Sequence, residues 1–147
     1  MTPGIPRRFS GQVIHGEGRG RKLGFPTANI APDGERARDL PRGVFAAQVA
    51  WAENSELRAL ANIGTRPTFA EGALSVELHI LDFSGDLYGQ RLEVTLLKKL
   101  RDERSFSKPT ELVEQIHRDI HQARVLFNRE IGPGKNNTTE VEGVDND

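Results

Sequence analysis

Apolar and polar residues alternate along several stretches in the first two thirds of the chain. Three of these stretches have an apolar residue at every second position: Phe45, Ala47, Val49 and Trp51; Leu74, Val76, Leu78 and Ile80; Leu92, Val94 and Leu96. A further apolar stretch, Leu57–Ile63, comes directly before Gly64. Because successive side chains of a strand point to opposite faces, this period of two predicts strands with one buried face.

The connections between the predicted strands are short. Residues 82–89 (Asp-Phe-Ser-Gly-Asp-Leu-Tyr-Gly) separate the last two strands and predict a hairpin connection, because glycine and aspartate are typical of tight turns. A crossover between parallel strands needs a longer segment, usually a helix. The pattern therefore predicts an antiparallel sheet, and about six short strands favour a small closed barrel.

One later segment, residues 109–130, has the period of an amphipathic helix. Its apolar residues recur at steps of three or four: Leu112, Ile116, Ile120, Ala123 and Phe127. Ser107 followed by Pro109 is typical of a helix start, and Gly132-Pro133 of a helix end. We therefore expect a mainly β fold: a closed six-stranded antiparallel barrel of Greek-key type with one C-terminal α-helix.

Length, charge and cysteine content narrow the class of protein. The 147 residues suffice for one domain with a buried core, and 20 Lys and Arg against 21 Asp and Glu disfavour a dedicated nucleic-acid-binding protein. The absence of cysteine excludes a disulfide framework and a thiolate metal site. No apolar run reaches the ~18–20 residues that span a membrane. We expect a cytoplasmic monomer without nucleic-acid or membrane partners.

The two ends of the chain differ in composition from its middle. Residues 1–8 contain two prolines and a glycine, which predicts an extended lead-in. Residues 132–147 are polar and acidic with few apolar positions, which predicts a disordered tail. The barrel and its helix would then occupy residues 9–131.

A glycine-rich basic segment, residues 16–30, is the first candidate for ligand binding. Glycines at positions 16, 18 and 20 alternate with charged residues and precede Arg21 and Lys22. Glycine lets the backbone approach a ligand closely, so that its N–H groups can point at phosphate oxygens. Thr27 and Asn29 supply neutral oxygens suited to Mg²⁺. A basic surface loop is the alternative, but the Pro-Thr-Ala-Asn run directly behind it favours a nucleotide site.

Glu77 is the candidate general base. In the alternating stretch 74–81, Val76 and Leu78 share one face, so Glu77 and His79 share the other. A carboxylate on a rigid strand is well placed to accept a proton from a substrate hydroxyl. The alternative is a solvated glutamate on the outer face of the sheet.

The histidines give weaker signals. His117 and His121 are four residues apart on the predicted helix but lack the glutamate of the zinc-protease motif and lie off the apolar stripe, so we expect both to be exposed. His15, at the start of the glycine-rich segment, would either touch a phosphate or simply end a strand.

A second basic and aromatic group lies between the last strand and the helix. Arg101 and Arg104 can bind an anion, and Phe106 can stack on a planar ring. The alternative is a salt-bridged connection with Phe106 filling the end of the barrel. The pattern leaves both open, and the chain contains neither a Walker motif nor a Gly-x-Ser-x-Gly elbow.

Together these segments resemble the riboflavin kinase family, which also forms the C-terminal module of bacterial bifunctional FAD synthetases. The resemblance covers residues 8–127 and rests on motifs in a fixed order: Gly-Gln-Val-Ile-His-Gly with Gly-Arg-Gly-Arg, Leu-Gly-Phe-Pro-Thr-Ala-Asn, Gly-Val-Phe, Asn-Ile-Gly-Thr-Arg-Pro-Thr-Phe, Val-Glu-Leu-His-Ile-Leu-Asp-Phe, Asp-Leu-Tyr-Gly and Leu-Arg-Asp-Glu-Arg-Ser-Phe. The family fold is a compact antiparallel barrel with a C-terminal helix, which agrees with the pattern above.

The resemblance implies a role for each group of residues. Thr27 and Asn29 would coordinate Mg²⁺ that bridges the ATP phosphates, and Glu77 would be the general base on the 5′-hydroxyl of riboflavin. The residues implied in ATP binding are Gly16, Lys22, Thr27, Asn29, Ile80, Asp82 and Tyr88. The residues implied on the flavin side are Arg101, Arg104 and Phe106.

The implied activity is ATP-dependent phosphorylation of riboflavin at its 5′-hydroxyl, giving FMN and ADP. Such phosphoryl transfer depends on positioning and charge neutralisation rather than on covalent steps. The alternative is a non-catalytic flavin-binding or regulatory module. Because the kinase pattern begins a few residues after Met1, we expect either a kinase that stands alone or a module of a bifunctional enzyme.

Overall fold

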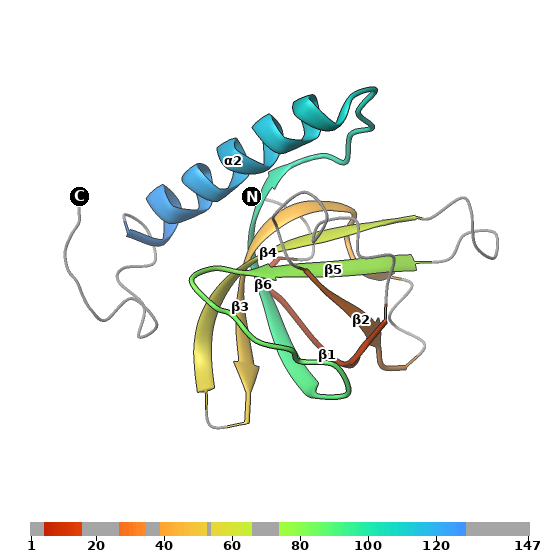
Figure 1. Cartoon of the computed structure of the whole chain (residues 1–147). Coiled ribbons are helices and arrows are strands. Elements are labelled where there is room, and N and C mark those ends of the chain that lie inside the picture. Colours follow the sequence, from red (N-terminus) through yellow and green to blue (C-terminus); the bar gives the residue numbers. More distant parts are fainter. Residues whose placement is uncertain (1–4, 16–26, 35–38, 53, 66–73, 129–147) are drawn as a thin grey trace.

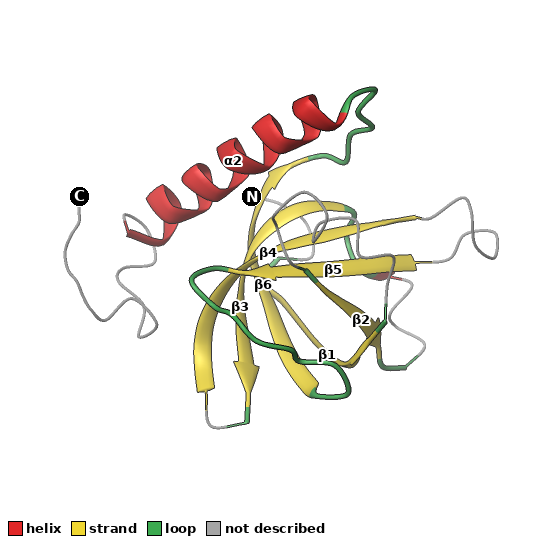
Figure 2. Cartoon of the chain, in the orientation of Figure 1, coloured by secondary structure: helices red, strands yellow, loops and turns green. Residues whose placement is uncertain are grey.

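Six strands and one α-helix form the secondary structure of the residues that the computed structural model describes, which are 5–15, 27–34, 39–52, 54–65 and 74–128. In chain order they are β1 (Arg7–Ile14), β2 (Ala28–Pro32), β3 (Gly43–Trp51), β4 (Asn54–Thr65), β5 (Leu74–Ile80), β6 (Arg91–Arg101) and α2 (Pro109–Leu126). Figure 1 shows α2 lying across the outside of the curved sheet, and Figure 2 gives the same view by type of element.

The strands close into an antiparallel barrel in the order β1-β2-β5-β4-β3-β6. β3, β4 and β5 are neighbours in sequence and in space, and β6 returns to pair with β3. Three consecutive strands with a fourth that returns beside the first form a Greek key. The predicted six-stranded antiparallel barrel with a C-terminal helix is therefore confirmed.

The interior of the barrel is filled by the apolar half of each alternating strand. The apolar positions predicted on β3, β5 and β6 are buried there, with Trp51 and Leu74 half-buried at the ends of their strands. Fully buried members of this core include Phe45, Ile63, Leu78, Leu92, Leu96, Val49, Val76 and Val94. Burying one such side chain stabilises the fold by ~1.5–3 kcal/mol, so the period of two sets the register of each strand.

The connection between β5 and β6 is not the hairpin that its sequence predicts. β5 pairs with β2 and β4, whereas β6 pairs with β1 and β3, so residues 82–89 cross one end of the barrel. Glycine and aspartate specify a change of chain direction, but they do not specify which strand becomes the next neighbour. The crossing segment buries Leu87 in the core and leaves Tyr88 exposed.

The first strand begins earlier than the sequence pattern indicates. β1 starts at Arg7, within the segment 1–8 that we expected to be an extended lead-in, and its pairing with β2 and β6 closes the barrel. The predicted tail, residues 132–147, lies outside the described residues.

Gly11 marks the closest approach between β1 and β2. A Cβ atom built on this buried glycine would overlap the carbonyl oxygen of Ala31 and lie 2.7 Å from Cγ2 of Ile30. Any larger residue would force the two strands apart, because a strand backbone cannot yield as the tip of a flexible side chain can.

Helix α2 packs on the outer face of the barrel. A second apolar cluster joins Val44 and Ala46 of β3 and Leu60 of β4 to the helix, where Ala123 and Leu126 are buried. This cluster is separate from the barrel interior, since the strand residues in it alternate with those that point inward.

The buried line of α2 differs from the predicted apolar stripe. The buried residues within the helix are Gln115, Asp119, Ala123 and Leu126, whereas the predicted members Leu112, Ile116 and Ile120 are only half-buried. Ala123 was predicted correctly, as was Phe127, which follows the helix and is fully buried. The buried line thus includes two polar side chains, Gln115 and Asp119, whose partners belong to the candidate site.

The boundaries of α2 agree with the predicted start but not with the expected cap. Lys108 is the N-cap residue and makes no side-chain capping bond, Pro109 is the first helical residue, and Ser107 instead donates to Glu111 at 3.2 Å. The predicted Gly132-Pro133 stop lies outside the described residues. No helix among the described residues is both long and apolar enough to cross a membrane.

We expect Gly11→Ala to lower the free energy of unfolding by about 1–3 kcal/mol, because the added methyl group overlaps backbone atoms of β2. Urea unfolding followed by circular dichroism would measure it. Ser10→Ala, the neighbouring position on β1, is the matched control. Equal stability of Gly11→Ala and the parent protein would contradict the packing described here.

Candidate active site

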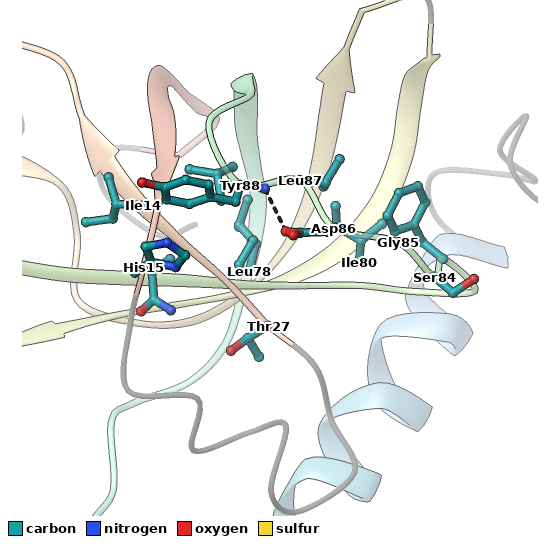
Figure 3. A pocket seen from close by; sticks show the side chains of 14 residues that line it. Ile14, His15, Thr27, Leu78, Ile80, Ser84, Gly85, Asp86, Leu87 and Tyr88 are labelled. Carbon is teal, nitrogen blue, oxygen red and sulfur yellow. Dashed lines mark hydrogen bonds between the residues drawn. The ribbon is translucent and has the colours of Figure 1, made fainter.

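A pocket of about 250 Å³ opens at one end of the barrel. It is enclosed by the ends of β1 and β2, by two residues of β5 and by the crossing segment 83–88 (Figure 3). Buried Val13, Leu78 and Leu87 give it an apolar base, and polar residues from β2 and the crossing segment stand around it. A concave apolar site with a few polar groups is the usual form of a small-molecule pocket.

The Pro-Thr-Ala-Asn motif places two neutral polar side chains at this pocket. Thr27 directly precedes β2 and Asn29 is its second residue, and both line the pocket. Residues two apart in an extended chain point to the same side. Ile80 and Tyr88 line the pocket as well, so these residues predicted in ATP binding converge, although their roles stay predictions.

Tyr88 is held beside His15 at the mouth of the pocket. The two rings stack with their centroids 3.7 Å apart at an interplanar angle of 16°. Figure 3 shows the two side chains next to each other. The backbone N–H of Tyr88 donates to Oδ1 of Asp86 at 2.9 Å, and the next residue, Gly89, donates to the carbonyl of Val13 at 3.0 Å. Tyr88 remains 51% exposed, so a planar face is available to a ligand.

Glu77 lies on β5, one strand away from Asn29. The strand register pairs Asn29 of β2 with Glu77, and Glu77 with Asn62 of β4. Directly paired residues share a face of the sheet, with Cβ atoms about 5 Å apart. Val76 and Leu78 are buried inside the barrel, so these three side chains lie on its outer face, and Glu77 is on the face opposite Val76 and Leu78, as predicted. We call Asn29, Glu77 and Asn62 the polar row.

Cross-strand pairing continues from the polar row, through β3, to the residues predicted to bind the flavin. Val44 of β3 pairs with Asn62 and, on its other side, with Arg101 at the end of β6. A Cβ atom on Gly64 would overlap the carboxylate of Glu103. The segment that follows β6 therefore lies against the outer face of β4, next to the polar row.

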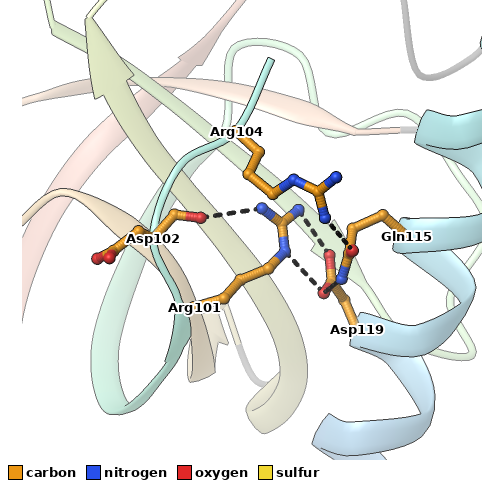
Figure 4. Close-up of polar contacts among 5 residues, drawn as sticks. All are labelled: Arg101, Asp102, Arg104, Gln115 and Asp119. Carbon is orange, nitrogen blue, oxygen red and sulfur yellow. Dashed lines mark hydrogen bonds and ion pairs between the residues drawn. The ribbon is translucent and has the colours of Figure 1, made fainter. Parts of the chain in front are cut away.

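Arg101 is attached to α2 by a buried ion pair. Its Nε and Nη2 atoms each donate to the Asp119 carboxylate at 2.9 Å, and its Nη1 donates to the carbonyl of Asp102 at 3.0 Å (Figure 4). The Asp119 side chain is only 3% exposed. The partner guanidinium thus explains why an aspartate occupies the buried line of the helix.

Arg104 and Phe106 extend this attachment. Nη1 of Arg104 donates to Oε1 of Gln115 at 3.0 Å, and Nε2 of Gln115 donates to Asp119 at 2.9 Å. The guanidinium carbons of Arg101 and Arg104 lie 5.9 and 4.9 Å from the centroid of the Phe106 ring. The segment is therefore salt-bridged, as one of the two alternatives from the sequence expects, but Phe106 packs against the two arginines and is not part of the barrel core. A role in flavin binding stays a prediction.

Asp82 points toward α2, and the pocket lining does not include it. Both carboxylate oxygens accept bonds from Arg124, at 2.9 and 3.0 Å. These hydrogen bonds lower the pKa of Asp82, an effect that burial opposes and that Coulombic attraction to Arg124 and Arg58 reinforces. The same bonds raise the pKa of Arg124. A direct contact of Asp82 with a nucleotide stays a prediction.

The sequence model of the riboflavin kinase family (Flavokinase) matches residues 3–127. This chain belongs to the riboflavin kinase family. It is 44% identical over 124 residues to the bifunctional riboflavin kinase/FMN adenylyltransferase of Escherichia coli strain K12, covering 84% of this chain and 39% of that protein. The chain thus spans about two fifths of the length of that relative.

Solved structures that resemble the fold include the following two. The riboflavin kinase of Trypanosoma brucei superposes with a TM-score of 0.62 and 27% identity, covering 85% of this chain and 82% of the other. A Streptococcus pneumoniae structure described as a macrolide-efflux protein gives a TM-score of 0.70 and 32% identity, covering 82% of this chain and 39% of that one. The barrel with its outer helix is therefore shared with a structure named as a riboflavin kinase.

The remaining predicted positions in this riboflavin kinase family member fall into two groups. Gly16 and Lys22 lie outside the described residues. His117 and His121 are exposed on α2, as expected. Within the described ranges, no group of three or more His, Asp or Glu side chains could hold a metal ion.

Sequence reasoning missed two residues of this site. Asn62 interrupts the apolar run of β4, and asparagine is depleted in strands, which was an available signal. Asp119 lies between apolar positions of the helix, but nothing local distinguishes it from a solvent-facing aspartate. The burial of Asp119 becomes apparent only from the position of its partner, Arg101, in the structure.

We expect Asp82→Asn to lower the free energy of unfolding by less than ~1 kcal/mol at neutral pH, because the ion pair with Arg124 is half exposed. The lowered pKa of Asp82 means that its stabilisation is complete above the ordinary value near 3.8 and is lost as the pH falls through the lowered value. Asparagine tolerates the backbone φ of 57° at this position.

Urea unfolding at neutral pH and at about pH 3 would test this sign. The difference between the parent protein and the variant should shrink in acid, with exposed Asp39→Asn as the control. A difference that grows in acid would contradict the assignment.

Proposed function

We propose that this chain phosphorylates riboflavin at its 5′-hydroxyl, using ATP and giving FMN and ADP. The observation that supports it most is the cross-strand pair of Asn29 and Glu77. It sets a pocket residue with a neutral oxygen beside a carboxylate on the outer face of a rigid barrel. Phosphoryl transfer needs this proximity between the group that holds the phosphates and the group that accepts the hydroxyl proton. Membership of the riboflavin kinase family supports the same reaction.

ATP would occupy the pocket at the end of the barrel. The stacked rings of His15 and Tyr88 offer a planar face, and the apolar base of the pocket suits the adenosine part. The glycine-rich segment 16–22, which continues directly from His15, would then cover the phosphates.

The donor set at the pocket fits Mg²⁺ bound together with phosphates. The Thr27 hydroxyl and the Asn29 carboxamide offer neutral oxygens of the kind that this hard cation prefers, and the nucleotide would contribute the anionic oxygens. When bound, Mg²⁺ would neutralise negative charge on the transferring phosphoryl group. Thr27 and Asn29 would hold the Mg²⁺ at the pocket end of the polar row, next to Glu77.

Glu77 would accept the proton of the 5′-hydroxyl. Its place beside Asn29, with Cβ atoms about 5 Å apart, brings the hydroxyl next to the phosphates without any rearrangement of the barrel. Its location on a strand that is paired on both sides, with β2 and with β4, fixes the carboxylate relative to the pocket.

The flavin would extend from Glu77 toward Arg101 over the outer face. Three strand spacings of ~4.8 Å, at most about 14 Å in all, separate β5 from β6. That distance leaves room for the ribityl chain and part of the ring system. Val44 of β3 lies on the direct line and is buried beneath α2, so the flavin would pass beside the helix rather than straight across β3. The guanidinium groups of Arg101 and Arg104 and the Phe106 ring stand at the far end of this path.

The proposal is tested by incubating the protein with riboflavin, ATP and Mg²⁺ and separating flavins by liquid chromatography. We expect FMN to appear in proportion to the enzyme. Tight flavin binding by a folded sample without any FMN would support the non-catalytic module instead. The expected cytoplasmic location and monomeric state stay predictions.

We expect Glu77→Gln to reduce kcat by a factor of ~10² or more, because the amide cannot accept the hydroxyl proton. Nucleotide affinity, measured by calorimetry, should change little, since Thr27, Asn29 and Tyr88 are untouched. Glu93→Gln, an exposed glutamate on β6, is the control. Normal turnover by the Glu77 variant would exclude this residue as the base.

A further inference from the structure

We propose that Asn62 is a positioning residue that orients the carboxylate of Glu77. This inference rests on the proposed function, in which Glu77 accepts a proton. Asn62 is the direct cross-strand partner of Glu77 on the side away from the pocket, and it is exposed on the same outer face. Glu77 thus has a carboxamide on either side, Asn29 toward the nucleotide pocket and Asn62 opposite.

The strand itself gives no reason for an asparagine at this position. The described neighbours of Asn62 along β4 are apolar or glycine, and Ala61 and Ile63 on either side of it are fully buried. Asparagine is among the residues depleted in strands, because its side chain competes for backbone hydrogen bonds. A contribution to stability would favour a β-branched residue here, so the amide points to a role on the face where it stands.

The chemistry of a carboxamide suits that role. Its NH₂ group has two donors, so it can bond one oxygen of the Glu77 carboxylate while the other oxygen faces the substrate hydroxyl. The carboxylate of Glu103 occupies the space above Gly64, two residues along β4 on the same face. A neutral donor at Asn62 separates these two like charges, whereas an acidic residue would add a third.

The reaction step stays balanced without any change in Asn62. The proton leaves the 5′-hydroxyl for a Glu77 oxygen as that hydroxyl oxygen bonds to the γ-phosphorus of ATP and ADP departs. Asn62 would neither gain nor lose a proton. Its contribution is the orientation of the accepting oxygen, which is the kind of alignment on which rates depend steeply.

The first test measures kcat and substrate affinity separately. For Asn62→Ala we expect a fall in kcat on the order of 10- to 100-fold, with riboflavin and nucleotide Kd values within about twofold of the parent. Asn62→Asp, which has the same shape but a like charge, should lose more activity than Asn62→Ala. Gln48→Ala, another outer-face amide, on β3 and paired with Arg58 and Thr95, is the matched control and should keep full activity.

A double-mutant cycle separates positioning from a general structural defect. If Asn62 acts through Glu77, adding Asn62→Ala to Glu77→Gln should produce almost no further loss of kcat. A defect of folding or a direct contact with riboflavin would instead reduce kcat or affinity again in the double variant. Additive losses, or a normal kcat for Asn62→Ala, would overturn the proposal.

A third measurement does not depend on turnover. NMR exchange rates of the Asn62 side-chain amide, assigned by its loss in Asn62→Asp, should be slow in the parent protein and fast in Glu77→Ala. Fast exchange in both would overturn the positioning contact even if FMN is formed. Slow exchange that depends on Glu77 in a protein that forms no FMN would support the contact and contradict the proposed function, so the two failures are distinguishable.

Discussion

Closure of the antiparallel ladder is the constraint on which the rest of this structure depends. Once β1 pairs with both β2 and β6, every strand has two neighbours, and alternate side chains must point outward at a level fixed by the register. The polar row follows from that geometry, because Asn29, Glu77 and Asn62 come from segments far apart in sequence but opposite one another in the barrel. A slip of β5 by one residue would turn Glu77 into the core.

The period of two predicted most of the barrel, because the sequence of each of β3, β5 and β6 contains the alternation that determines its buried face. It did not resolve β1, where Gly11 stands at an inward position and interrupts the apolar alternation. The pattern also did not predict which strands pair with each other. Residues 82–89 contain turn residues typical of a hairpin, yet they cross between strands that are not paired. Long-range pairing is a property of the closed sheet rather than of any one segment.

In the candidate site, too, the sequence predicted what depends on one strand but not what depends on the pairing of several strands. The outward direction of Glu77 follows from its own strand, but its position between Asn29 and Asn62 requires the register of three strands. The helix shows the same limit. Its apolar stripe was predicted correctly at Ala123 but one residue away from the buried line at Ile120, since Asp119 is buried only because Arg101 reaches it from β6. Ion pairs between distant elements leave no periodic signal in the sequence.

Helix α2 is tied to the barrel by two ion pairs of unequal exposure. Arg124 holds Asp82, at the start of the crossing segment, through a pair whose side chains are about half exposed, whereas Asp119 holds Arg101 almost out of solvent. Salt screens exposed charges far more than buried ones. Rising ionic strength would therefore weaken the pair of Asp82 and Arg124 while the pair of Asp119 and Arg101 keeps its strength. The buried Ala123, Leu126 and Phe127 would still hold this end of the helix on the barrel, so that salt would loosen the contact with Asp82 without moving α2.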